Sequence, residues 1–320
     1  MRSHGDWMAA AARLAARARP LSRPNPAVAC IIVKDGTVQA RGWTQAGGRP
    51  HAEAAALAQM PEGGAAGATI YVTLEPCAHQ SERGPSCSDL IVAAQPENVV
   101  IGVTDPDPRT SGNGIARLRE AGIAVDVLDH PDAKASLAGF LTRETQGRPF
   151  LTLKLAMSED GFIAREPGQD QWITGEVARA HVHGQRARQD AILVGRGTWE
   201  ADRPRLDVRL PGIEDRSPQR YVLTRGAAPD GVGALASPDA ISELSEIQYL
   251  YIEGGAGAAQ AFMDAGLVDK LHIYTAPITI GSGTKAPAQL LPQALGQSSE
   301  WYATEKRQLG SDTFTAYSRA

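Results

Sequence analysis

Cysteine is scarce in this sequence: Cys30, Cys77 and Cys87 are the only three among 320 residues. So small and odd a number cannot build the disulfide framework of a small secreted domain. We therefore expect the protein to work in a reducing compartment, the cytoplasm, where thiols serve metal binding, catalysis or core packing.

Basic charge and long apolar runs are lacking too. Lys and Arg number 32 against 36 Asp and Glu, so the net charge is −4 at pH 7, and the isoelectric point is near 6.0. Such a balance offers no cationic field for nucleic acid. The sequence also contains no uninterrupted apolar stretch of about 18 residues, the length that a membrane-spanning helix requires. We expect a small-molecule substrate, and neither nucleic acid nor membrane as a partner.

The length suits two domains of about 150 residues each, and the residue pattern divides in the same way. In each half, apolar runs of strand length alternate with segments of helical periodicity, which predicts α/β sheets covered on both faces. The segment 146–149, Gln-Gly-Arg-Pro, has linker composition, so we predict domains over 1–146 and 147–320. Strands are expected at 27–33, 37–43, 69–74, 99–103, 124–128, 150–157, 191–194, 221–223, 249–252 and 270–275, and helices at 53–60, 89–94, 114–121, 176–188 and 258–265.

Residues 51–87 contain the strongest functional signal, a set of metal-binding residue types. His51 opens a helical segment, Cys77 follows a strand directly, and Cys87 precedes another helical run. Zinc binds His nitrogen and Cys thiolate tetrahedrally, and a catalytic site has three protein ligands plus water, whereas a structural site has four. Cysteines near helix starts are favoured as thiolates. The sequence therefore predicts a catalytic zinc site.

Glu53 is the expected catalytic residue of this site. It lies two residues after His51, so it can reach the metal-bound water without being a ligand. His-x-Glu followed by Pro-Cys is the pattern of zinc deaminases, in which zinc lowers the pKa of water toward about 7 and the Glu moves the proton to the leaving amine. Taken singly, each of these residues is as easily a packing residue; together they predict hydrolytic deamination. Cys30, inside an apolar run, is interpreted as a core thiol.

The second half has a glycine-rich turn between a strand and a helix. Glu253-Gly254-Gly255-Ala256-Gly257 lets backbone N–H groups approach a phosphate at the helix start, although an ordinary tight turn looks the same. It is not the G-x-G-x-x-G pattern of a Rossmann fold. Lys154 lies on an expected strand followed by a turn.

Longer motifs carry a family resemblance. The nine residues between Cys77 and Cys87, read as Pro-Cys-x-His followed by Gly-Pro-x-Cys, resemble the pyrimidine deaminase domain of the bifunctional riboflavin-biosynthesis deaminase/reductase. The motifs of the second half, in their order, resemble the reductase domain of that family. The resemblance covers the whole chain and also rests on Asn-Pro-Ala-Val at 25–28, Val-Lys-Asp-Gly at 33–36 and Thr-Asp-Pro-Asp-Pro at 104–108.

The resemblance implies a fold and cofactors. We expect an N-terminal cytidine-deaminase-like three-layer αβα domain followed by a dihydrofolate-reductase-like α/β domain. The implied cofactors are Zn²⁺ and NADPH, and the implied assembly is a homodimer or larger homo-oligomer.

The resemblance also implies roles for individual residues. Asn25 and His79 would contact the pyrimidine in the deaminase, whereas Thr44 and Asp170 stand where many relatives carry histidine and serine. In the reductase, arginines suit the ribose 5-phosphate because they bind phosphate bidentately. The implied NADPH contacts are Ala156, Trp172, Thr198, Asp202, Gly255, Ala256, Gly257, Ala258, Ala259, Gln260 and Ala261, and the implied substrate contacts are Lys154, Asp170, Arg186, Leu206, Arg209 and Glu253.

The expected function is two consecutive steps of riboflavin synthesis. The first is hydrolytic deamination of 2,5-diamino-6-(5-phosphoribosylamino)pyrimidin-4(3H)-one, and the second is NADPH-dependent reduction of the ribosyl group to give 5-amino-6-(5-phosphoribitylamino)uracil. Lys154 would assist ring opening or hold the substrate. One alternative is a nucleoside or tRNA deaminase with a non-catalytic nucleotide-binding second domain, and another is a zinc-stabilised protein without catalysis. The acidic isoelectric point disfavours the first and the presence of Glu53 the second.

Overall fold

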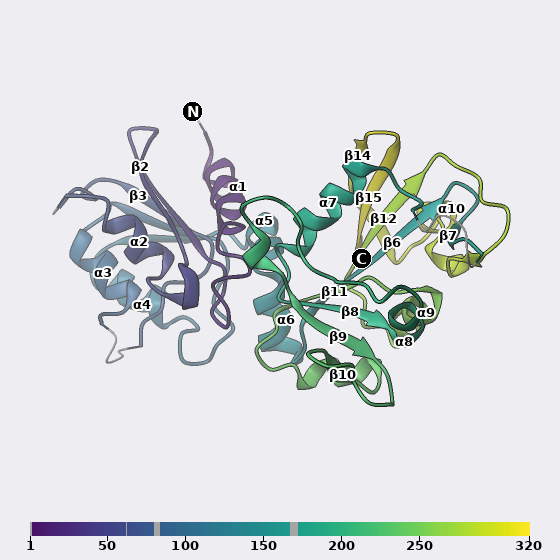
Figure 1. The fold of residues 1–320 in the computed structure, drawn as a ribbon. Helices are drawn as coiled ribbons and strands as arrows, with labels where there is room; N and C mark the ends of the chain where they lie inside the picture. The colour runs from purple at the N-terminus through teal and green to yellow at the C-terminus, as the bar shows by residue number, and fades with distance from the viewer. Residues whose placement is uncertain (1, 62, 80–83, 167–171) are drawn as a thin grey trace. The chain divides into compact units, whose positions relative to one another are not determined.

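The chain forms two compact units, Met1–Gly147 and Arg148–Ala320, in a computed structural model. The structure describes residues 2–61, 63–79, 84–166 and 172–320. Each unit is built on its own sheet (Figure 1). Within the described residues, no helix is both long and apolar enough to cross a membrane.

The first unit is built on a five-stranded sheet in the order β2-β1-β3-β4-β5. β1 runs antiparallel to β2 and β3, whereas β3, β4 and β5 are parallel. Asp35 and Gly36, with φ of +53° and +70°, make the tight turn between β1 and β2 that an Asp-Gly pair favours. The strands are β1 (Ala29–Lys34), β2 (Thr37–Trp43), β3 (Thr69–Val72), β4 (Asn98–Ile101) and β5 (Ala124–Val127).

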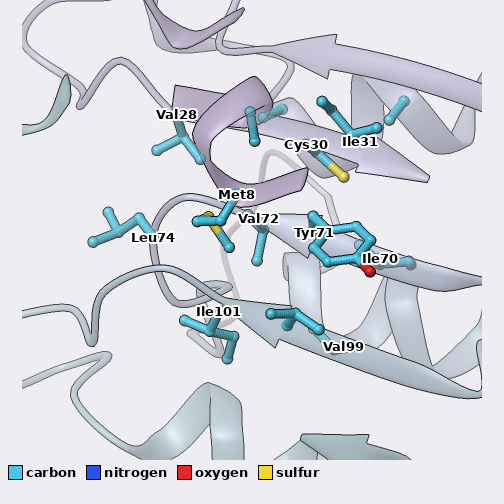
Figure 2. Packing of buried hydrophobic residues seen from close by; sticks show 14 of the residues in the cluster. Met8, Val28, Cys30, Ile31, Ile70, Tyr71, Val72, Leu74, Val99 and Ile101 are labelled. Atoms are coloured by element: carbon cyan, nitrogen blue, oxygen red, sulfur yellow. The ribbon is translucent and has the colours of Figure 1, made fainter. Parts of the chain in front are cut away.

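Helices cover both faces of this sheet, as the alternating pattern predicted. α2 (Ala52–Leu57), α3 (Cys87–Ala94) and α4 (Asn113–Glu120) lie together on one face, and α1 (His4–Ala15) and α5 (Pro131–Ser136) pack together on the other (Figure 1). α6 (Ala138–Gln146) ends the unit. Met8 of α1 lies next to Val72 of β3 in the core (Figure 2). Cys30 is fully buried in the same cluster, which confirms it as a core thiol.

The second unit contains an eight-stranded sheet in the order β10-β9-β8-β11-β6-β12-β15-β14. The strands from β10 to β12 are parallel, and β15 and β14 add an antiparallel edge. β7 (Phe162–Ala164) and β13 (Thr284–Lys285) form a separate pair. The sheet strands are β6 (Phe150–Ser158), β8 (Ala191–Gly195), β9 (Gln219–Leu223), β10 (Gly233–Leu235), β11 (Tyr249–Ile252), β12 (Lys270–Ala276), β14 (Trp301–Leu309) and β15 (Asp312–Arg319).

Helices also flank the second sheet. α7 (Glu176–Arg186) packs Ala178 and Val182 against Tyr274 and Phe314. α9 (Ala256–Asp264) buries Phe262 in a different cluster, and α8 (Arg196–Asp202) and α10 (Pro292–Gly296) complete the unit. The carboxyl ends of β8, β9 and β11 meet at one edge of the sheet, where ligands bind in open α/β folds.

Candidate functional site

The three predicted metal ligands come together in the first unit. His51 is the N-cap of α2, Cys77 follows β3 after a short connection, and Cys87 is the first residue of α3. The Nδ1 atom of His51 lies 3.3 Å from the Cys87 Sγ and 3.7 Å from the Cys77 Sγ. All three ligand atoms lie within 4.8 Å of one another.

These separations fit a tetrahedral zinc ion. Zn–N and Zn–S bonds of about 2.0–2.1 Å and 2.3 Å at the tetrahedral angle hold a nitrogen and a sulfur about 3.6 Å apart. The two observed N–S distances, 3.3 Å and 3.7 Å, bracket that value. One imidazole and two thiols are the ligand types zinc prefers, and three ligands leave a fourth position for water.

Hydrogen bonds already favour a thiolate in this cluster. The Cys87 thiol and then His51 stabilise the Cys77 thiolate, so that the pKa of Cys77 falls to about 4. The backbone N–H of Cys87, at the start of α3, also donates to the Cys77 Sγ, 3.4 Å away. The shared hydrogen bond raises the pKa of the Cys87 thiol. A bound zinc would deprotonate both thiols.

Glu53 lies in the first turn of α2 and is 4% exposed. Burial, and then the negative charge of Cys77, raise the pKa of Glu53 to about 7. A carboxyl group with such a pKa both accepts and releases a proton near neutral pH, which general acid–base catalysis requires. The geometry therefore provides a metal site with a proton carrier beside it.

Glu75 is a residue of this site that sequence reasoning missed. It is buried directly before Pro76 and Cys77, and its carboxylate accepts four backbone N–H groups, from Asp105, Gly112, Gly114 and Ile115. A Cβ on Gly114 would come within 2.0 Å of the Pro76 carbonyl oxygen, so α4 packs directly against the Cys77 segment. The Thr-Asp-Pro-Asp-Pro motif is thus tied to the metal ligands, and the adjacent Glu-Pro-Cys order was the available signal.

Hydrogen bonds of Asn25 and Thr44 join the segments 25–28 and 44–48. The Asn25 amide donates to the Gly48 carbonyl oxygen at 3.1 Å. The Thr44 hydroxyl donates to the Pro26 carbonyl at 2.9 Å and accepts from the Val28 N–H at 3.1 Å. Thr44 is 2% exposed, so here this position supports the Asn25 segment from within the fold. His79 is exposed. The pKa of Asp107 in the Thr-Asp-Pro-Asp-Pro motif is lowered mainly by Arg109 and, to a smaller extent, by His79.

A cavity of about 940 Å³ brings together most of the residues singled out in the second unit. It opens at the carboxyl ends of β8, β9 and β11 and runs along β6. Asp170 lies outside the described residues. The predicted residues that line the cavity are Lys154, Ala156, Trp172, Arg186, Thr198, Asp202, Leu206, Arg209, Glu253, Gly255, Gly257 and Ala258.

The segment 255–261 forms the start of α9, which begins two residues before the predicted helix 258–265. Gly255 is the N-cap of α9, and its N–H donates to the Thr198 hydroxyl at 3.0 Å. Because a helix presents only one face to the cavity, Ala259 is buried in the core and Gln260 bonds Asp264 instead. Ala256 is the first residue of the helix, and Ala261 lines a second hollow of about 500 Å³ with Arg196 and Arg225.

Glu253 is the centre of a buried charge cluster. Its carboxylate accepts from the Arg186 Nε at 2.5 Å and Nη2 at 2.9 Å, and the Lys154 Nζ lies 3.6 Å away. Burial alone would raise the pKa of Glu253, but Arg186 and Lys154 outweigh it and hold that pKa at about 2. Burial lowers the pKa of Lys154. Arg186 lines the cavity while it is paired with Glu253, and the Arg209 side chain is the more exposed of the two arginines.

A His-Cys-Cys metal cluster beside a buried glutamate, on an αβα sheet, defines a zinc-dependent deaminase, and a second α/β unit holds a large cavity lined by cationic side chains. Family models agree with this division. Residues 1–103 match the cytidine and deoxycytidylate deaminase zinc-binding region, and residues 149–314 match the RibD C-terminal domain. The chain belongs to the RibD family of riboflavin biosynthesis proteins, which unite a deaminase and a reductase.

Individual relatives are similar to this chain over most of its length. A riboflavin biosynthesis protein RibD from Escherichia coli strain K12 is 35% identical over 96% of each chain. One from Chlamydia muridarum is 43% identical over 70% of this chain and 61% of its own length. A Thermotoga maritima structure, titled a diaminohydroxyphosphoribosylaminopyrimidine deaminase/5-amino-6-(5-phosphoribosylamino)uracil reductase, is 29% identical with a TM-score of 0.86 over 99% of each chain.

Proposed function

We propose that this protein carries out two consecutive reactions on a phosphoribosylated pyrimidine. Residues 1–146 hydrolyse the 2-amino group of 2,5-diamino-6-(5-phosphoribosylamino)pyrimidin-4(3H)-one, and residues 147–320 then reduce the ribosyl group with NADPH. The observation that carries the proposal is the buried Glu53 beside a cluster that holds three metal ligands among the described residues, because this arrangement suits hydrolysis rather than structural support.

In the first reaction, His51, Cys77 and Cys87 would hold zinc, which supplies an activated water when bound. Glu53 would take a proton from the attacking water while the oxygen of the water bonds to the pyrimidine carbon. Glu53 would then deliver a proton to the departing amine. The C–N bond breaks, ammonia leaves, and a carbonyl remains. Asn25 and His79 are proposed to contact the pyrimidine.

In the second reaction, the cavity holds both the phosphoribosyl group and NADPH, which supplies a hydride when bound. The ribose ring opens when its oxygen takes a proton, leaving a C1′–N double bond that becomes an amine as C1′ receives the hydride. Lys154 and Glu253, which line the cavity, are proposed to contact the substrate, and Arg209 is proposed to bind its phosphate. The α9 start around Gly255 offers N–H groups to a cofactor phosphate.

Two measurements on one sample test the proposal. The protein is incubated with the diaminopyrimidine phosphate, with and without NADPH, and both ammonia release and NADPH oxidation are followed. We expect ammonia in both samples and NADPH oxidation that begins only after deamination. NADPH oxidation without ammonia would contradict the order, and ammonia from cytidine or tRNA alone would support the alternative deaminase.

Setting and assembly belong to the same proposal. The relatives that match along the whole chain are named riboflavin biosynthesis proteins, which supports a cytoplasmic enzyme with a small-molecule substrate and no nucleic-acid or membrane partner. The net charge of −4 agrees with this. We propose a homodimer or larger homo-oligomer, which sedimentation velocity would test.

A further inference from the structure

Residues 203–209 form a loop along one wall of the reductase cavity, and α7 holds the backbone of this loop at two points. The Arg186 Nη1 donates to the Asp207 carbonyl oxygen at 2.9 Å, and the His183 Nδ1 accepts the Arg209 backbone N–H at 3.2 Å. His183 and Arg186 are three residues apart and therefore lie on one face of the helix. Both side chains also line the cavity.

The conformation of the loop depends on such anchors. Leu206 has a φ of +57° although it is not glycine, and it is 3% exposed. Left-handed backbone at a bulky residue persists only where surrounding contacts impose it. Leu206 packs with Val222 and Tyr251, and the Val208 N–H donates to the Ser217 hydroxyl at 2.9 Å.

The anchored loop presents positive charge. The Arg205 and Arg209 side chains are 75% and 48% exposed, and each contacts Asp207. Because Asp207 engages only part of each guanidinium, further N–H donors remain for a bidentate phosphate contact. Arg205 and Arg209 both line the cavity, and Arg209 is the one whose backbone His183 holds.

The protonation state of His183 suits this contact. Burial, and then Arg186 and Arg209, lower the pKa of His183, so the ring is neutral near pH 7. A neutral imidazole keeps a lone pair on one nitrogen, which the Arg209 N–H requires. The mechanism above assigns His183 no part.

We propose that His183 is a positioning residue of the reductase site: by holding the backbone of Arg209, it sets the arginine against the phosphate of the substrate. The inference rests on the proposed function and names the residue through which the site selects a phosphorylated substrate. The corresponding readout is the ratio of kcat/KM for the deaminated phosphoribosyl substrate to kcat/KM for its dephosphorylated form.

Three single variants test the role. His183→Ala should lower that ratio about 10-fold, since a hydrogen bond that orients a charged contact is lost. His183→Asn keeps an acceptor at the position of Nδ1 and should restore the ratio to within about 3-fold of the wild type. His181→Ala is the matched control: His181 lies on the same helix as His183, but its Nδ1 bonds the hydroxyl of Tyr274 in β12 at 2.9 Å, so this variant should leave the ratio unchanged. A general loss of packing would lower both kcat/KM values by the same factor and leave their ratio unchanged.

A double-mutant cycle tests whether His183 acts through Arg209. In an Arg209→Ala background, His183→Ala should change the ratio by less than about 2-fold. An additive effect, an unchanged ratio in His183→Ala, or failure of His183→Asn to restore it would each overturn the inference. If the wild type itself does not oxidise NADPH with the phosphoribosyl substrate, the proposed function has failed instead.

Discussion

The guanidinium of Arg186 and the carboxylate of Glu253 form a two-point ion pair, Nε to Oε1 at 2.5 Å and Nη2 to Oε2 at 2.9 Å. The two residues come from α7 and from the end of β11, and both side chains are largely buried. The pair therefore ties a helix to the sheet edge at which the cavity opens. The Glu253 carboxylate also lies 3.6 Å from the Lys154 Nζ. The pair therefore affects both the stability of the unit and the electrostatic environment of Lys154.

Removing one charge of this pair should destabilise the second unit strongly. Glu253→Gln leaves Arg186 buried without its counter-charge, a change that costs about 3–5 kcal/mol of unfolding free energy. Glu200→Gln is the matched control, because the Arg196–Glu200 pair is exposed and its loss costs at most about 0.5 kcal/mol. Urea unfolding followed by hydrogen-exchange mass spectrometry separates residues 148–320 from 1–147. Equal effects of the two variants would contradict the prediction.

Glu53→Gln should abolish deamination and spare the metal. The amide cannot carry a proton, so we expect ammonia release to fall about 10²- to 10⁴-fold. Zinc content by mass spectrometry should stay at the wild-type level. Reduction of separately supplied deaminated substrate is the internal control and should continue. Normal ammonia release from this variant would remove Glu53 from the mechanism.

Zinc removal should separate the two activities. Dialysis against a strong chelator takes away the metal held by His51, Cys77 and Cys87, and ammonia release should stop. NADPH oxidation with the deaminated substrate should be unaffected, since the reductase cavity lies within the other unit. Added Zn²⁺ should restore deamination. Chelator-resistant deamination in metal-free protein would contradict the assignment.

The second unit should lose stability below pH 6.5 because of His272. This ring is 5% exposed, and its Nδ1 lies 3.2 Å from the Tyr251 hydroxyl. Burial lowers the pKa of His272 well below 6.5. As the pH falls below 6.5, His272 therefore binds a proton in the unfolded chain but not in the folded chain. Stability is present above pH 6.5 and falls by up to about 1.4 kcal/mol per pH unit below it.

Urea unfolding between pH 5 and 7.5 measures this slope. His272→Asn keeps an acceptor at the Nδ1 position and cannot titrate, so its slope should be smaller by one proton. His181 and His183 contribute in the same direction, because their pKa values are also lowered. A slope that His272→Asn leaves unchanged would rule out His272 as the source.

The metal cluster could be predicted because its signal is local in sequence. His51, Glu53, Cys77 and Cys87 lie within 37 residues, and each sits at the start of a helix or beyond a strand that is recognisable from its own pattern. Their placement together needed only that α2 and α3 pack on the same face of the sheet that contains β3. The elements agree closely with expectation: the predicted strand 37–43 is β2, and the predicted strand 249–252 is β11.

Long-range partners could not be predicted in the same way. Arg186 and Glu253 are 67 residues apart, and no pattern in either segment identifies the other as its ion-pair partner. From sequence, Arg186 is therefore expected only as a substrate contact and not as the partner of Glu253. Likewise, nothing near Glu75 in sequence shows that four N–H groups from residues 105–115 converge on it.

The C-terminal hairpin of β14 and β15 also could not be predicted from the sequence. β14 is exposed along most of its length, so it lacks the alternation that marks a half-buried strand, and no strand was predicted at 301–309. Its position comes from pairing with β15, which lies beside β12. Pairing of this kind depends on the assembled sheet rather than on the composition of the strand.

His51 is both a metal ligand and the N-cap of α2, and no hydrogen bond from its side chain caps the helix. An ion held by His51 would therefore also fix the residue at which the helix begins. When the ion is lost, the helix 52–57, which carries Glu53 in its first turn, should fray before any other part of the unit unfolds. The proton carrier would thus become disordered together with the ion it serves, so the metal-free protein would lack a correctly placed base as well as an activated water.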